Sequence, residues 1–191
     1  MTFNFTMSKS LLKWACKLAF KEWKHYEDRP TDGRRYNHNS LKGCYVGRKS
    51  EVAVFGLFKK KIPNEDLRSE FTKPIHEADI LVNDYLIEVK GLQEKQWSKF
   101  KRMVPPAQLK KYAAKDAIIV WTTTEGDKET ALVKIRGWNY AKDLIDKGEE
   151  CRTICDNIWL RHDKDMRKVP DLLNMLQTSA YDALKQWANN N

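Results

Sequence analysis

Two carboxylates and an amine, those of Asp79, Glu88 and Lys90, lie in a short segment that is otherwise largely apolar. Mg²⁺ favours carboxylate oxygens and takes one or two of them, with water and substrate phosphate completing its coordination. A bound metal polarises phosphoryl oxygens and lowers the pKa of water, while a nearby ammonium orients the attacking water or offsets developing charge. The residue types therefore predict metal-dependent phosphodiester hydrolysis, with Mg²⁺ or Mn²⁺ as the cofactor.

A β-hairpin is predicted to bring these side chains together. The pair Asn83-Asp84 separates two apolar runs, which is typical of a tight turn between strands. A two-residue loop places Asp79 opposite Glu88, and strand alternation turns Lys90 to the face of Glu88. Two anions that face each other about 5 Å apart at Cβ repel unless a cation compensates them. The other expected cross-strand pairs are Val82 with Tyr85, Leu81 with Leu86 and Ile80 with Ile87.

A helix is expected directly after Pro105-Pro106, because helices often start at proline and the run up to Lys115 is rich in strong helix formers. Gln108 and Tyr112 are four residues apart and so share one face of this helix. A glutamine and a tyrosine at this spacing often occur by chance. Their position just after the hairpin is what makes them candidates for the same site.

A second helix is predicted for Gly47–Phe58, with Val54 and Phe55 on its buried face. Glu51 precedes them by three and four residues and shares that face. A carboxylate directed at an apolar core is costly unless a charge or a metal meets it. Alternatively, Glu51 lies at the edge of the apolar stripe in the first turn, where the helix dipole favours an acidic group.

Asp79 followed by Glu88-Val89-Lys90 resembles the core motif of the PD-(D/E)xK nuclease superfamily. The Gln108 and Tyr112 pair resembles the Gln-x-x-x-Tyr motif of the branch that includes RecB-like and lambda-exonuclease-like nucleases. The chain departs from the family pattern at Ala78, where many members have proline. The resemblance implies an α/β fold with a restriction-endonuclease-like core, in which a mixed central β-sheet is flanked by helices.

The resemblance also implies roles for the individual residues. Asp79 and Glu88 would bind the metal, and the backbone carbonyl of Val89 can add a ligand. Glu51 matches the acidic residue on the helix before the core strands, which supports the metal or its water. Lys90 would assist the attacking water. The glutamine and tyrosine of the following helix would order the site and the DNA phosphates.

The charge balance favours a polyanionic partner, since the formal net charge is +9 and the pI is about 9.3. Basic residues are concentrated between positions 94 and 115, where Trp97 and Phe100 either stack on unpaired bases or pack inward. The residues expected to bind nucleic-acid phosphates are Lys95, Lys99, Lys101, Arg102, Lys110 and Lys111, with Arg34 and Arg35 in a predicted surface loop at 33–42.

The length of 191 residues and the hydrophobic content of 41% predict a single domain with one core. Within it we expect an N-terminal helix and loop at 1–44, a catalytic core at 45–137 and a C-terminal helical extension at 138–191. The motifs cover about residues 45–125. No run is long and apolar enough to span a bilayer, and Lys13 and Lys17 interrupt the N-terminal one, so we expect an intracellular protein without a signal peptide or a membrane partner.

The four cysteines, at positions 16, 44, 151 and 155, show no paired framework and are expected to be reduced. Some relatives of the resembling family hold an iron–sulfur cluster with one early and three late cysteines. Only Cys151 and Cys155 are late here, so no such cluster is expected. A zinc site that adds His162 to these two is not expected either.

The remaining segments fit an α/β domain. The β-branched runs at 116–124 and 130–136 predict neighbouring strands, and 138–147 predicts a helix. The polar segment 158–170 predicts a loop, and 170–187 predicts a closing amphipathic helix.

The expected function is that of a metal-dependent deoxyribonuclease in DNA processing, recombination or mobile-element biology. The alternatives are a restriction-like or homing endonuclease, a nuclease that acts on RNA, and a non-cleaving DNA-binding protein on the same scaffold. The sequence leaves open the choice between exonuclease and endonuclease, as well as the oligomeric state.

Overall fold

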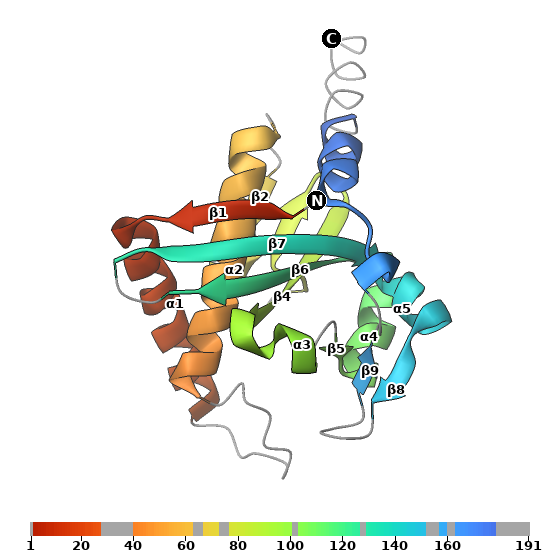
Figure 1. The fold of residues 1–191 in the computed structure, drawn as a ribbon, viewed down its shortest axis with the longest axis horizontal. Helices are drawn as coiled ribbons and strands as arrows, with labels where there is room; N and C mark the ends of the chain where they lie inside the picture. Colours follow the sequence, from red (N-terminus) through yellow and green to blue (C-terminus); the bar gives the residue numbers. More distant parts are fainter. Residues whose placement is uncertain are drawn as a thin grey trace.

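The computed structural model describes residues 2–27, 40–62, 67–72, 77–100, 103–126, 129–151, 157–159 and 163–178. These residues form a mixed α/β structure (Figure 1). The strands are β1 (Phe3–Met7), β2 (Leu67–Ser69), β3 (Ile80–Val82), β4 (Tyr85–Gln93), β5 (Met103–Val104), β6 (Ile118–Glu125), β7 (Ala131–Tyr140), β8 (Glu149–Cys151) and β9 (Asn157–Trp159). The α-helices are α1 (Lys9–Glu27), α2 (Leu41–Lys61), α3 (Trp97–Phe100), α4 (Pro106–Ala113) and α5 (Ala141–Lys147), and residues 169–178 are also helical. Short 3-10 helices are η2 (Glu70–Thr72), η3 (Glu94–Gln96) and η4 (Asp163–Asp165).

The main sheet has six strands in the order β1-β7-β6-β4-β3-β2. Only the β4–β6 pair is parallel, and the other neighbours run antiparallel. A small separate sheet has the order β5-β9-β8. The expected mixed sheet with flanking helices is thus confirmed at the level of the α/β class.

Helices cover both faces of the main sheet. Along β6, Ile118 and Val120 pack into the core that contains α1 and α2, whereas Ile119 and Trp121 pack into the core that contains α4 and α5. This alternation follows from strand geometry, and it explains why β6 is apolar on both faces. Figure 1 shows α1 and α2 on one side of the view and α4 and α5 on the other. Among the described residues, no helix is sufficiently long and apolar to cross a membrane.

The predicted hairpin is confirmed, with all three expected cross-strand pairs in register. Asn83 takes the left-handed conformation, with φ of 51°, which asparagine tolerates better than most residues. The prediction fails one step further along, because the β3–β4 ladder ends at Ile80. The carbonyl of Asp79 accepts hydrogen bonds from the backbone N–H groups of Glu70 and Phe71, at 2.9 Å each. The Asp79 N–H still donates to the Ile87 carbonyl of β4 at 3.0 Å. Because the Asp79 carbonyl turns toward the 3-10 helix η2, the regular register ends at Ile80, and Asp79 is not paired with Glu88.

Several predicted boundaries are shifted. The strand expected at 130–136 continues to Tyr140, so 138–140 belong to β7 and the helix starts only at Ala141. The N-terminal helix spans Lys9–Glu27 and is preceded by strand β1, which was not predicted. The segment expected as a loop at 158–170 contains the end of β9, η4 and the start of the last helix.

Some expectations fall partly outside the described residues. Ser40 caps α2, since its hydroxyl accepts a hydrogen bond from the Gly43 N–H at 3.0 Å, so the last positions of the predicted loop at 33–42 are helical. The rest of that loop, and the closing helix beyond residue 178, lie outside the description.

Candidate active site

The site is built where β4 has lost its β3 neighbour. Because β3 begins at Ile80, the residues of β4 from Glu88 onward are not paired with it. Ile87 and Val89 pack toward the α1 and α2 side, so Glu88 and Lys90 point to the opposite face, toward α4. Two side chains lie against this part of β4: Ser50 of α2 packs on Gly91, and Asp79 accepts a hydrogen bond from the Val89 N–H.

Asp79 is bound to this unpaired part of β4. Its Oδ2 accepts a hydrogen bond from the Val89 N–H at 2.7 Å, and only 4% of the residue is exposed. The same carboxylate adds to the rise that burial causes in the pKa of both Glu51 and Glu88, so it repels both. The carboxylates of Asp79 and Glu88 therefore interact, as predicted. They do so because the Asp79 side chain is bound to the Val89 N–H, and not because the two residues are paired across the strands.

Lys90 connects β4 with α4. Its Nζ donates to Glu88 Oε1 at 2.7 Å and to Gln108 Oε1 at 3.1 Å, and it lies 5.5 Å from the centroid of the Tyr112 ring. Burial lowers the pKa of Lys90, but the carboxylates of Glu88, Asp79 and Glu51 together outweigh this effect, and the net shift is upward. Lys90 is therefore a protonated donor in this arrangement. The predicted pair on α4 does lie at the site.

Glu88 is held in a buried position, with 7% of the residue exposed. Burial raises the pKa of its carboxyl, and repulsion from Asp79 adds to the rise. Lys90 and a hydrogen bond from Tyr112 oppose these effects without reversing them. The carboxylate form of Glu88 is thus less favourable than that of an exposed glutamate.

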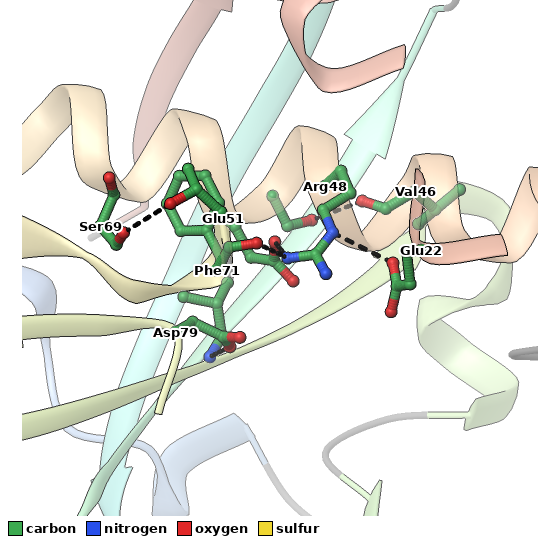
Figure 2. A network of polar contacts seen from close by, with 10 residues as sticks. Glu22, Val46, Arg48, Glu51, Ser69, Phe71 and Asp79 are labelled. Carbon is green, nitrogen blue, oxygen red and sulfur yellow. Dashed lines mark hydrogen bonds and ion pairs between the residues drawn. The ribbon is translucent and has the colours of Figure 1, made fainter. Parts of the chain in front are cut away.

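Glu51 enters the site from α2 together with Arg48, which the sequence analysis had missed. Arg48 Nη1 donates to Glu51 Oε2 at 2.6 Å and to the Phe71 carbonyl at 2.7 Å, and Nε donates to Glu22 Oε2 at 3.0 Å. Figure 2 shows Arg48 between Glu22 of α1 and Glu51, with Asp79 below them. Glu51 faces inward as expected, and its carboxylate is paired with the Arg48 guanidinium. The alternative, a position at the edge of the apolar stripe in the first turn, is wrong, since α2 begins at Leu41 and not near Gly47, and only 8% of Glu51 is exposed.

Burial raises the pKa of Glu51 well above its ordinary value. Asp79 raises the pKa further, and Arg48 lowers it less than these two effects raise it. Burial lowers the pKa of Arg48, but Glu51 and Glu22 outweigh it and raise the pKa above its ordinary value. A charged guanidinium is therefore a fixed component of this network.

A glycine sets the separation of α2 from β4. A Cβ atom on Gly91 would lie 2.1 Å from the Oγ and 2.8 Å from the Cβ of Ser50, one residue before Glu51. Such distances are far below van der Waals contact. The missing side chain therefore lets α2 approach close enough to bring Glu51 to the site.

The carboxylates of the site are the type of ligand that a hard divalent cation prefers. Asp79, Glu88 and Glu51 offer carboxylate oxygens, and Mg²⁺ needs only one or two of these besides water and phosphate. Burial, and after it repulsion from Asp79, raises the pKa of Glu51 and of Glu88, and a bound cation would offset both effects. No group of three or more His, Cys, Asp or Glu residues in the described ranges is arranged to hold a metal by itself.

The stability of the metal-free protein should decrease as the pH rises. Glu51 and Glu88 have higher pKa values in the folded chain than the ordinary 4.5, so the folded state binds more protons than the unfolded state. Their contribution to the free energy of unfolding is therefore largest below the ordinary pKa and is lost as the pH rises through the folded pKa values. Mg²⁺ requires the deprotonated forms, so we expect its stabilising effect to grow from about pH 5 to about pH 8.

Thermal melts followed by circular dichroism, with and without saturating Mg²⁺, measure both effects. Glu88→Gln should flatten the decline of Tm with pH. A Mg²⁺-induced rise in Tm that is larger at about pH 5 than at about pH 8 would contradict the assignment of these carboxyls.

Only some of the residues that we expect to bind nucleic acid lie in the described part of the chain. Lys95, Lys110 and Lys111 are exposed, as phosphate contacts require. Trp97 is buried and lies under the Arg136 guanidinium, 5.4 Å from the ring centroid, so it packs inward and does not stack on bases. The positions that fall outside the description are the side chains of Lys99 and Phe100 and all of Lys101, Arg102, Arg34 and Arg35.

The cysteines add no site among the residues that can be placed. Cys16 is exposed and Cys44 is buried, and neither forms a disulfide with another described residue. Burial raises the pKa of the Cys44 thiol to about 11, which makes it a poor nucleophile. Cys155 and His162 lie outside the described residues, as does the side chain of Cys151.

No family model, curated protein or solved structure matches the chain. Its function is therefore inferred from the geometry of the site and from the motif resemblance.

Proposed function

We propose that the protein is a metal-dependent nuclease that hydrolyses phosphodiester bonds in DNA. The observation that carries this proposal is the gathering of three buried acidic residues, Glu51, Asp79 and Glu88, in which the Asp79 carboxylate acts on both of the others and the Lys90 ammonium donates to Glu88. Buried like charges are costly to a fold, and they are concentrated where a site needs a cation.

The arrangement of elements supports the same proposal. The helix α2, the hairpin β3–β4, the helix α4 and the strand β6 follow one another, and β6 lies parallel to β4. This order is compatible with the restriction-endonuclease-like core that the motif resemblance implies. The exposed Lys110 and Lys111 on α4, together with the net charge of +9, favour a nucleic acid as the substrate.

Each side chain has a proposed role. Asp79 and Glu88, with the carbonyl of Val89, would hold Mg²⁺ or Mn²⁺, which supplies a polarised phosphate and a more acidic water. Lys90 is protonated and therefore donates to the attacking water or to a phosphate oxygen; it is not the base. Gln108 and Tyr112 orient Lys90 and Glu88, and thereby help to align the site with the DNA phosphates.

Incubation of the protein with plasmid and with linear duplex DNA tests this function. We expect cleavage with Mg²⁺ or Mn²⁺ and none with EDTA, because the carboxylates cannot activate water alone. Cleavage of the closed circle would indicate an endonuclease, and loss of linear DNA only would indicate an exonuclease. Cleavage of matched RNA oligonucleotides alone would identify RNA as the substrate. DNA binding without cleavage in either metal would refute the proposed nuclease activity.

A further inference from the structure

The buried network at α2 already contains a permanent cation. Arg48 is only 5% exposed and donates to acceptors from three elements: Glu51 on its own helix, Glu22 on α1 and the Phe71 carbonyl in η2. Release of the guanidinium would leave two carboxylates and a buried carbonyl without their donor, which is costly. Arg48 is therefore pinned beside Glu51.

Lys90 is held much more loosely beside Glu88. It is paired with one carboxylate and one neutral amide, and 22% of its side chain is exposed. A flexible ammonium can shift while it keeps the Gln108 contact, whereas a planar guanidinium bound on several sides cannot. Glu51 and Glu88 therefore differ in their access to another cation. The cation beside Glu88 can shift to admit one, whereas the cation beside Glu51 cannot.

The net formal charge of the network equals the charge that one divalent cation would neutralise. Four carboxylates, those of Glu22, Glu51, Asp79 and Glu88, face two cations, Arg48 and Lys90, which leaves a formal charge of −2. A second divalent ion at Glu51 would lie against the fixed guanidinium and be repelled by it in a poorly hydrated site.

From these contacts we infer that the site takes one divalent cation, at Asp79 and Glu88, and that Arg48 stands where a second metal would otherwise neutralise Glu51. This inference rests on the metal-dependent function proposed above and narrows it. Glu51 then acts on the metal only through its charge and through the position of Arg48.

Titration of the metal-free protein with Mn²⁺ alone, followed by calorimetry and by the electron paramagnetic resonance signal of free Mn²⁺, tests the inference without any cleavage assay. We expect one ion per chain in the unmodified protein. Glu51→Gln should keep this stoichiometry and change Kd by less than about tenfold, whereas Asp79→Asn should weaken binding by about a hundredfold or more. Arg48→Met should bind a second ion or bind Mn²⁺ about tenfold more tightly, since it leaves Glu51 uncompensated.

Each alternative result has a distinct meaning. Two ions in the unmodified protein, or a hundredfold loss of binding in Glu51→Gln, would make Glu51 a ligand and overturn the inference. Weaker binding in a folded Arg48→Met variant would show that Arg48 only maintains the shape of the site. If that variant does not fold, Glu51→Gln decides alone. No uptake by the unmodified protein would instead refute the metal site itself.

Discussion

Asp79→Asn should reduce DNA cleavage by about a thousandfold or more, because several kcal/mol of metal-derived transition-state stabilisation correspond to a factor of this size. Asparagine has the same shape as aspartate, and its Oδ1 can still accept the hydrogen bond from the Val89 N–H. The substitution therefore removes the charge and keeps the contact that closes the edge of β4. Binding of DNA without metal should stay close to that of the unmodified protein.

The same substitution should stabilise the metal-free protein near neutral pH. Asp79 raises the pKa of both Glu51 and Glu88, so its removal relieves repulsion among buried carboxylates. A gain in Tm together with a loss of activity is characteristic of a functional site and not of a structural one. Initial cleavage rates and thermal melts on the same preparations measure both effects.

Asp84→Asn is the matched control for this experiment. Asp84 is an exposed residue of the same hairpin, so the change in charge is identical while the site is untouched. It should alter activity and Tm little. Comparable cleavage by the Asp79→Asn and Asp84→Asn variants would contradict the proposed role of Asp79 as a metal ligand.

Lys90→Met should destabilise the fold by about 3 kcal/mol and reduce cleavage by about a hundredfold or more. The loss of stability arises because Glu88 remains buried after its partner at 2.7 Å has gone. The loss of activity arises because the donor to the attacking water or phosphate has been removed. Urea denaturation and initial cleavage rates measure the two losses separately.

The double variant Lys90→Met with Glu88→Gln separates the two effects. It removes both members of the buried pair, so most of the stability should return while cleavage stays at least as low as in Lys90→Met. Lys95→Met, just beyond β4, is exposed and should change stability by less than about 0.5 kcal/mol. Full activity of Lys90→Met would contradict the proposed role of its ammonium.

Local patterns predicted the hairpin and the inward face of Glu51 because both depend on neighbours along the chain. The two-residue turn at Asn83-Asp84 sets the register of β3 and β4, and this register was confirmed. The displacement of Asp79 could not be predicted, since it depends on backbone hydrogen bonds from η2, a 3-10 helix without a strong sequence signal.

Arg48 illustrates the limit of local patterns. Its spacing of three residues from Glu51 was visible in the sequence and could have suggested an ion pair on one helix face. Its other partners, Glu22 and the Phe71 carbonyl, are 26 and 23 residues away in sequence, and only the fold brings them together. The error at 138–140 has a similar cause, because pairing with β6 extends β7 beyond the predicted strand end.

The close contact at Gly91 joins two parts of the proposed site. Glu51 and Arg48 lie on α2, whereas Glu88 and Lys90 belong to β4, and Ser50 packs against the bare backbone at Gly91. A larger residue at position 91 would force α2 away from β4, because even its Cβ would lie 2.1 Å from the Ser50 Oγ. The approach of Glu51 to the sheet therefore depends on the absence of a side chain at a single position of β4.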